Sequence, residues 1–163
     1  MDIEQWRPIP GFEGLYEASD RGRIRSLDRD KRRGRLLKQR PQLGRQYIIV
    51  MMCKDGAYQN QLVHRLVLKA FRGEPPSGFE ACHNNGDAAD NRLDNLRWDT
   101  RAGNSRDQVT HGTHRNTVKT HCKRGHRFDT DNTYVRPGGQ RNCRECKRLV
   151  HDVRYNARRK RQD

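Results

Sequence analysis

Apolar residues in this chain occur in short runs that polar, glycine-rich segments separate. The densest run covers residues 47–53 (YIIVMMC), where β-branched and other strand-forming residues predominate. The turn formers KDG follow at 54–56, and residues 57–62 continue beyond them. This pattern predicts a β-hairpin.

The segment after the hairpin has helical periodicity. Apolar residues in VHRLVLKAF, at 63–71, recur at intervals of three and four, and Gly73 with two nearby prolines ends the pattern. We therefore expect a helix over 63–71. His64 lies on this helix, and we expect a structural histidine with satisfied hydrogen bonds, with a contact to DNA or to the functional site as the alternative.

A strand, a loop, a second strand and a helix are predicted between residues 79 and 111. The strands at 79–83 and 96–99 flank a loop rich in Asn, Asp and Gly, which cannot bury itself. Thr100 is a candidate N-cap for a helix over 101–111. Such an arrangement folds residues far apart in this stretch onto one small site.

Both ends of the chain predict small β-rich pieces. Residues 1–20 place a few aromatic residues among Pro and Gly, and we expect Trp6 and Tyr16 to form a small core there. A short strand is expected at 23–27. Near the other end, TYVRPGGQR at 133–141 predicts a hairpin with a Pro-Gly-Gly turn, and a helix is expected from residue 145 onward, with a frayed basic tail as the alternative.

Composition argues against one large core. Of the 163 residues, 31% are hydrophobic and 34% are charged, which favours several small modules ordered in part by a metal ion or nucleic acid. The net charge is +15, and basic residues outnumber acidic ones by nine in each of the segments 21–45 and 119–163. Two basic segments around a nearly neutral centre are typical of a protein that binds double-stranded DNA.

The cysteines indicate a reducing compartment. Their number, five, is odd, and three of them have the spacing of a metal site, so a disulfide framework is disfavoured and a cytoplasmic setting is expected, in a host cell if the chain is encoded by a phage. No apolar run is long enough to span a bilayer, so no membrane partner is expected. The sequence carries no signal for the oligomeric state.

A metal-site pattern lies near the end of the chain. CKRGH at 122–126 and CREC at 143–146 together offer three thiolates and an imidazole, the ligand set of a structural zinc ion. The predicted ligands are Cys122, His126, Cys143 and Cys146. His121 is the competing choice for the fourth position. Beyond this site we expect a helix or tail whose basic residues bind DNA phosphates, namely Arg154, Arg158, Arg159 and Lys160.

Several stretches resemble HNH homing endonucleases of the ββα-metal type, as found in phages. These are HRLVLKAF, CHNNGD, NRLDNLRW and GNSRD between residues 62 and 107, and WRPIPGFEGLYEASDRGRIRSL at 6–27 is similar to the NUMOD4 motif that precedes such domains. The resemblance implies a metal-dependent endonuclease that cleaves double-stranded DNA. It also implies a DNA-contacting role for the basic residues after the motif, which are Arg21, Arg23, Arg25, Arg32 and Arg33.

The same resemblance assigns roles to three residues. His83 would be the general base, Asn95 would help to hold it, and Asn104 would bind the catalytic divalent ion, Mg²⁺ or Mn²⁺. His83 precedes Asn95 by twelve residues and Asn104 by twenty-one. In this hypothesis Asn95 or a backbone carbonyl holds Nδ1 of His83 and leaves Nε2 facing the attacking water.

One position departs from the family pattern. Similar enzymes often have a metal-binding Asp immediately before the first His, and this chain has Cys82 there. A thiol is a poor ligand for magnesium, so we expect Cys82 to be a small buried residue and Asp87, water and substrate phosphate to complete the coordination. This departure keeps a second hypothesis open, a catalytically impaired zinc-containing nucleic-acid-binding protein.

Together these patterns predict an α+β fold with three modules. Residues 1–45 would form a small β-rich NUMOD4-like DNA-binding module. Residues 46–112 would form a ββα-metal HNH nuclease core. Residues 113–163 would form a Cys3His zinc module with a basic tail.

Overall fold

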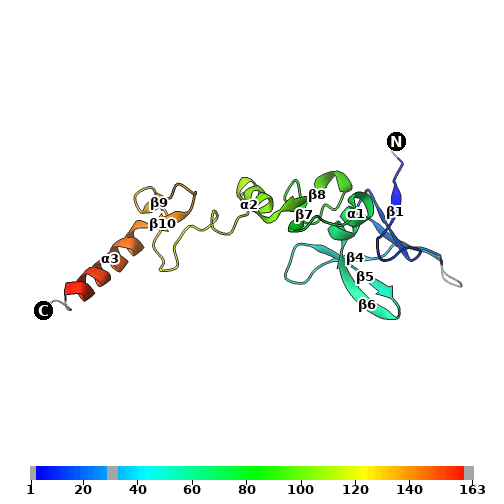
Figure 1. Ribbon diagram of the computed structural model, residues 1–163, viewed down its shortest axis with the longest axis horizontal. Helices are drawn as coiled ribbons and strands as arrows, with labels where there is room; N and C mark the ends of the chain where they lie inside the picture. Colours follow the sequence, from blue (N-terminus) through cyan, green and yellow to red (C-terminus); the bar gives the residue numbers. More distant parts are fainter. Residues whose placement is uncertain (1–2, 29–32, 160–163) are drawn as a thin grey trace. The chain divides into compact units, whose positions relative to one another are not determined.

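The computed structural model describes residues 3–28 and 33–159, with side chains along the last helix up to residue 153. The chain divides into two compact units, residues 1–111 and residues 112–163, and each is described on its own. Its elements confirm the predicted α+β class (Figure 1). In the part of the chain that the structure describes, no helix is both long and apolar enough to cross a membrane.

The first unit begins with a three-stranded antiparallel sheet. Strands β1 (Trp6–Pro8), β2 (Tyr16–Ser19) and β3 (Ile24–Ser26) follow one another in sequence order. Trp6 pairs with Ser19, and Tyr16 pairs with Ser26. The strand expected at 23–27 is thus confirmed, whereas β1 was not predicted.

A second antiparallel sheet contains the predicted hairpin. Strand β5 (Ile48–Lys54) pairs with β6 (Ala57–Leu62), and the short strand β4 (Gln39–Pro41) lies along the other edge of β5. Asp55 and Gly56 form the two-residue turn with φ of 51° and 78°, the left-handed geometry that such hairpins need. Figure 1 shows β5 and β6 side by side as a long hairpin.

Helix α1 (Val63–Arg72) starts directly after β6 and organises the core. Its buried face carries Val63, Leu66, Val67 and Leu68, at the predicted helical spacing. The helix ends at Gly73, whose φ of 78° stops the helical backbone.

One hydrophobic core joins both sheets, α1 and the following hairpin. Its buried members come from β1 to β3 and the turns beside them, from β5, from α1 and from β8, and they are Ile9, Tyr16, Ala18, Ile24, Val50, Met52, Val63, Leu66, Val67, Leu68 and Leu96. The Tyr16 hydroxyl donates to the Cys53 carbonyl at 3.1 Å and accepts from the Cys53 amide at 2.9 Å. Tyr16 is therefore a core residue, as expected, but its core is shared across the whole unit.

The strand, loop, strand and helix expected between residues 79 and 111 are confirmed. Strand β7 (Phe79–His83) pairs with β8 (Leu96–Thr100), a 3₁₀ turn, η1 (Leu93–Asn95), precedes β8, and α2 (Arg101–Thr110) follows it. The Thr100 side chain accepts from the Gly103 amide at 3.1 Å, so the predicted N-cap is present.

The second unit has little apolar interior. Strands β9 (Thr133–Val135) and β10 (Arg141–Cys143) form the predicted hairpin, and α3 (Arg144–Arg159) follows at once. Among the described residues of this unit, only Cys143 is buried. Something other than a hydrophobic core must therefore hold it together.

Candidate functional site

His83 ends strand β7 and is 9% exposed. Its Nε2 lies 3.2 Å from Oδ1 of Asn91, which is itself 6% exposed. The Asn91 Nδ2 donates to the Ala89 carbonyl at 3.2 Å, so the amide oxygen is the atom that faces the ring. His83 therefore carries its proton on Nε2 and keeps the lone pair of the neutral ring on Nδ1.

This arrangement corrects the hypothesis about how His83 is held. The holding residue is Asn91 instead of Asn95, and the held nitrogen is Nε2 instead of Nδ1. Sequence reasoning missed Asn91 because it lies among several Asn and Asp residues in one polar loop. The signal available was its place two residues before Leu93, the first apolar residue after the loop glycine and alanines.

Asn95 stabilises the loop between the strands. Its Oδ1 accepts from the Asn85 amide at 3.0 Å, and its Nδ2 donates to Asn85 Oδ1 at 3.0 Å and to the Asp90 carbonyl at 2.8 Å. Its own carbonyl accepts from the Asn84 amide at 2.8 Å. These bonds fix the backbone that follows His83, and none of them reaches the His83 ring.

His83 stacks in a group of three rings with Tyr47 and His64. The ring centroids of His64 and His83 are 5.1 Å apart, and those of Tyr47 and His64 are 5.0 Å apart. His64 is 3% exposed, and its Nδ1 is buried with no hydrogen-bond partner among the residues that the structure describes, so the expectation of a satisfied histidine is not confirmed.

Burial keeps both histidines neutral. It lowers the pKa of His64 to about 3, with smaller contributions from His83 and Arg65. Burial also lowers the pKa of His83, against an opposing effect of the Asn91 hydrogen bond and of nearby carboxylates. At neutral pH a proton acceptor is thus available at Nδ1 of His83.

Asn104 lies on α2 and contacts the opposite face of β7. Its Nδ2 donates to Oε2 of Glu80 at 3.2 Å, which leaves the amide oxygen of Asn104 as the atom that could bind a metal ion. Side chains alternate along a strand, so Glu80 and Cys82 share one face of β7 and His83 lies on the other. The structure therefore gives His83 and Asn104 separate contacts on the two faces of one strand.

Cys82 is a buried thiol, as expected. It is 3% exposed, and burial raises its pKa to about 11, although Arg97 beside it acts in the other direction. Arg97 pairs with Asp99 at 2.9 Å and also with Asp107. A neutral thiol does not fit a hard divalent cation, whereas the amide oxygen of Asn104 and the carboxylate of Glu80 do.

Asp87 already has another role in the loop. Its Oδ1 accepts from the Ala89 amide at 2.9 Å, and its own amide donates to Asn85 Oδ1 at 2.9 Å. Gly86 lies next to it with φ of 76°, and a Cβ on that glycine would lie 2.7 Å from Nδ1 of His111. The loop is therefore packed against the end of α2.

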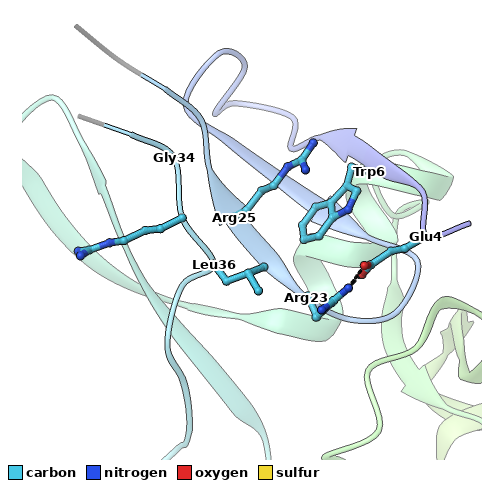
Figure 2. Close-up of a pocket in the computed structure, with 7 residues that line it drawn as sticks. Glu4, Trp6, Arg23, Arg25, Gly34 and Leu36 are labelled. Carbon is cyan, nitrogen blue, oxygen red and sulfur yellow. Dashed lines mark hydrogen bonds and ion pairs between the residues drawn. The ribbon is translucent and has the colours of Figure 1, made fainter. Parts of the chain in front are cut away.

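Two of the arginines that we expected to bind DNA form ion pairs with acidic residues of the first unit. Arg23 pairs with Glu4, and Arg25 pairs with Glu17 at 2.6 Å. Their guanidinium carbons lie 5.8 Å and 4.3 Å from the centroid of the Trp6 ring, which they flank (Figure 2). The Trp6 ring therefore contacts two arginine side chains and is not part of the hydrophobic core, in contrast to our expectation.

These side chains line a pocket together with the segment before β4. Its lining residues are Glu4, Trp6, Arg23, Arg25, Gly34, Arg35 and Leu36. Of the other expected DNA contacts, Arg21 and Arg33 are exposed. Arg32 and Lys160 lie outside the described residues, as do the side chains of Arg154, Arg158 and Arg159.

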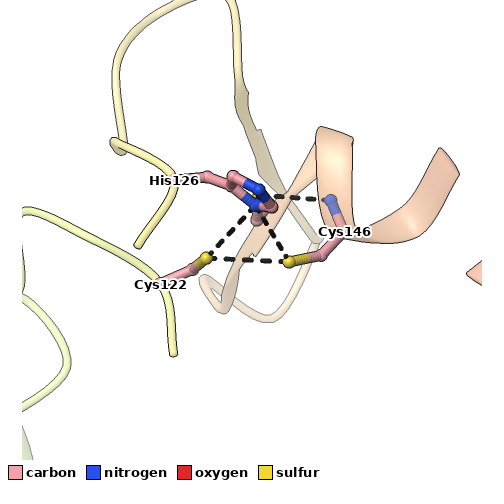
Figure 3. Close-up of side chains that lie close together, drawn as sticks. Cys122, His126 and Cys146 are labelled. Carbon is pink, nitrogen blue, oxygen red and sulfur yellow. Dashed lines mark hydrogen bonds between the residues drawn. The ribbon is translucent and has the colours of Figure 1, made fainter. Parts of the chain in front are cut away.

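The second unit gathers the four predicted metal ligands. The ligand atoms of Cys122, His126, Cys143 and Cys146 all lie within 4.8 Å of one another, and Figure 3 shows three of these side chains converging. His121 lies outside this cluster and has its Nδ1 2.9 Å from the Thr120 hydroxyl.

The spacing within the cluster suits a tetrahedral ion. Nδ1 of His126 is 3.6 Å from Sγ of Cys122, 3.5 Å from Sγ of Cys143 and 3.3 Å from Sγ of Cys146. Ligand atoms about 2.0–2.3 Å from a tetrahedral zinc ion would be about 3.5–3.8 Å apart. Backbone amides of Arg124 and Cys146 each donate to a cluster sulfur at 3.4 Å, which stabilises thiolate charge.

Comparison with known proteins gives two family matches, and both lie in the first unit. The NUMOD4 motif matches residues 4–53, and the HNH endonuclease family, of the HNH_3 type, matches residues 61–106. DNA endonuclease I-HmuI from Bacillus phage SP01 is 34% identical over 110 residues, which are 67% of this chain and 60% of that protein. The uncharacterized HNH endonuclease L247 from Acanthamoeba polyphaga mimivirus is 33% identical over 119 residues, 71% of this chain and 27% of that protein.

A solved structure gives the same result. The structure of the HNH homing endonuclease I-HmuI, on its DNA binding and cleavage, aligns with a TM-score of 0.58 at 32% identity, covering 67% of this chain and 60% of that one. The chain thus spans about three-fifths of the length of this relative, and neither family match extends beyond residue 106. The chain thus carries a NUMOD4 motif followed by an HNH endonuclease domain, and over about two-thirds of its length it is similar to an HNH homing endonuclease.

Proposed function

We propose that this protein is an HNH-type DNA endonuclease that hydrolyses phosphodiester bonds with His83 as the general base. The observation that carries the proposal is the buried hydrogen bond from Nε2 of His83 to Asn91, because it leaves the lone pair on Nδ1. The lowered pKa of His83 keeps this nitrogen unprotonated at neutral pH.

In the proposed reaction, Nδ1 of His83 takes a proton from water as the water oxygen bonds to phosphorus. The bond from phosphorus to the 3′ oxygen breaks on the opposite side, and that oxygen takes a proton from solvent. Asn91 fixes the tautomer and the plane of the ring, while Asn95 holds the loop after it. Asn95 is therefore a positioning residue in this scheme.

We propose that Asn104 and Glu80 hold a divalent cation, Mg²⁺ or Mn²⁺, with water and substrate phosphate as further ligands. Glu80 lies 3.2 Å from the Asn104 amide and offers the carboxylate that position 82 lacks. Magnesium commonly keeps several waters and few protein ligands. When bound, such an ion would supply positive charge to the DNA phosphate that it contacts.

Double-stranded DNA is the proposed partner, since the relative I-HmuI is described as binding and cleaving DNA. We assign DNA contacts to two segments, the NUMOD4-like module at 1–45 and the tail of the module at 113–163, around the nuclease core at 46–112. The stretches 21–45 and 119–163 each carry an excess of nine positive charges. Within the first segment, the exposed Arg33 is better placed for phosphates than Arg23 and Arg25, which are paired with Glu4 and Glu17.

For the second unit we propose a structural zinc ion on Cys122, His126, Cys143 and Cys146. The support is the spacing of these ligand atoms and the shortage of buried apolar residues around them. Such thiolates persist in a reducing compartment, which favours action inside the host cell.

Cys82 favours a second candidate function, a DNA-binding protein with an impaired HNH site. Its neutral thiol occupies the position where related enzymes often carry a metal-binding Asp. The two functions differ in one measurable respect, which is metal-dependent cleavage.

Plasmid cleavage tests the proposal. Relaxation or linearisation of supercoiled plasmid is expected with Mg²⁺ or Mn²⁺, and His83→Ala should lower the rate by about 10²–10⁴-fold while DNA affinity stays within a few-fold. His114→Ala, on a histidine of the segment after α2, is the matched control and should cut normally. Equal loss of binding and cutting in His83→Ala would make His83 structural, and no cutting by the wild type with any divalent ion would favour the impaired-site function.

A further inference from the structure

The turn between β2 and β3 meets the loop that holds His83. Gly22 in this turn is buried, and a Cβ built on it would lie 2.7 Å from the Asn91 carbonyl oxygen, 2.8 Å from the Asn91 carbonyl carbon and 3.0 Å from the Asn91 Cβ. Two of these atoms are backbone, which cannot move aside as a flexible side chain can. Only glycine fits this contact, and its φ of 79° disfavours other residues as well.

Hydrogen bonds clamp the turn on both sides of that contact. The Asp20 carbonyl accepts from the Leu93 amide at 2.8 Å, and the Gly22 carbonyl accepts from Nε2 of Gln39 at 2.9 Å. The turn is also braced internally, because the Ser19 hydroxyl accepts from the Arg23 amide at 2.9 Å. The turn between β2 and β3, which belongs to the NUMOD4 motif, is therefore in close contact with residues 91–93 of the HNH domain.

We propose that the β2–β3 turn, through Gly22, is a positioning element of the nuclease site that acts on His83 through Asn91. The Asn91 backbone is held from one side by the turn, and its side chain fixes Nε2 of His83 on the other. A displacement of Asn91 by a few tenths of an ångström would lengthen a hydrogen bond that is already 3.2 Å long. His83 would then lose its preference for the Nε2-protonated form and its fixed ring plane.

The alternative is that the turn only contributes to folding. Both accounts predict some loss of stability when Gly22 is changed, so stability alone does not separate them. They differ in the state of the His83 ring in protein that remains folded. The proposal rests on the assignment of His83 as the base, but the ring state can be measured without any cleavage.

The experiment compares Gly22→Ala with Gly14→Ala in the full chain. Gly14 also has a positive φ, 70°, in a turn of the same sheet, but a Cβ there would meet nothing within 4 Å. Both variants carry the same backbone strain, and only Gly22→Ala adds the collision with Asn91. Ring ¹⁵N chemical shifts of His83 should report Nε2 protonation in the wild type and Gly14→Ala, and a mixture of tautomers in Gly22→Ala.

Cleavage kinetics supply the second readout. Gly22→Ala should lower kcat by about 10- to 100-fold with KM for DNA unchanged, because misplacement of a reacting group affects the chemical step. Asn91→Ala should have the same effect, and the double variant should be no slower than Asn91→Ala alone, because both act on one contact. Asn91→Asp should raise the pH at which cleavage reaches half its maximum, since a carboxylate beside Nε2 raises the pKa of His83.

Several results would overturn the proposal. A wild-type ring spectrum and pH profile in folded Gly22→Ala would reduce the turn to a packing element, as would fully additive losses in the double variant. If Gly22→Ala does not fold, Gln39→Ala removes the clamp on the Gly22 carbonyl and should shift the His83 ring signals in the same direction, and unshifted signals would count against the proposal. If no protein cuts DNA, the proposed function fails, and the ring spectra still decide the role of the turn.

Discussion

The two units of this chain achieve order in different ways. The first unit buries apolar side chains from two sheets, α1 and β8 in one cluster, with Ile9, Ile24, Val63 and Leu68 fully buried. The second unit buries only Cys143 among its described residues, and four ligand side chains converge where a core would be. Burying one such aliphatic side chain is worth about 1.5–3 kcal/mol, so the first unit can fold on apolar contacts, whereas the proposed zinc ion would supply free energy of folding to the second.

The two units also differ in the surroundings that they give to their candidate functional side chains. The first unit holds its candidate base in a rigid hydrophobic setting, with His83 stacked on His64 and bonded to Asn91. The second unit presents mostly exposed side chains around its cluster. A large core thus permits a buried, neutral histidine, whereas a unit with few buried residues presents most of its side chains at the surface.

Removal of the proposed zinc ion should have the largest effect of the changes considered, and it should affect only the second unit. Strong chelation, or Cys143→Ser, should unfold the second unit and leave the first folded, because structural zinc contributes about 10–16 kcal/mol in small modules. NMR spectra before and after chelation would measure this, with loss of dispersed signals confined to residues after 112. Cys53→Ser, at a half-buried cysteine of the first unit, is the control. Unchanged spectra under chelation would remove the zinc assignment.

Removing buried side-chain volume from α1 should destabilise the first unit and leave the second unit unaffected. Leu68 is fully buried, so Leu68→Ala should lower the free energy of unfolding of the first unit by about 2–5 kcal/mol. The metal affinity of the second unit should stay the same. Urea unfolding and a zinc competition titration would measure the two effects, and Val153→Ala, at an exposed apolar position on α3, is the matched control. A change in zinc affinity on Leu68→Ala would show that the units are not independent.

Acid should weaken the first unit through His64. The folded pKa of His64 is lowered to about 3 from 6.5, so between these values the unfolded chain binds the extra proton and stability falls as pH falls. The slope is about 1.4 kcal/mol per pH unit, which gives about 2 kcal/mol at pH 5. This stability is fully present above pH 6.5.

Urea unfolding at pH 7 and pH 5 would measure the acid effect. His64→Phe keeps an aromatic ring in the stack and should flatten the pH dependence. An equally steep dependence in this variant would assign the effect to other groups.

The smallest effects should come from single arginines. Arg33→Gln should reduce the slope of log affinity against log salt by about 0.9, if its side chain contacts one phosphate. Arg23→Gln and Arg25→Gln should change it less, because Glu4 and Glu17 already neutralise these side chains. DNA-binding titrations at several salt concentrations would measure this. Equal changes for all three arginines would show that the ion pairs open on DNA.

The sequence by itself determined the local elements and the ligand chemistry. A run of strand-forming residues and a turn-forming segment predicted the β5–β6 hairpin, helical spacing predicted α1, and Thr100 predicted the start of α2. The spacing of Cys122, His126, Cys143 and Cys146 indicated their cluster. These predictions succeeded because each depends on residues close in sequence, where backbone geometry and side-chain chemistry act directly.

Tertiary structure decided how those parts act on one another. Gly22 meets Asn91 across 69 positions of sequence, and Tyr47, His64 and His83 stack from a loop, a helix and a strand. Neither contact has a periodicity or a spacing that a sequence displays, because each depends on how separate elements pack around the shared core. The tautomer of His83 follows from such packing, since only the folded chain determines which amide faces which nitrogen.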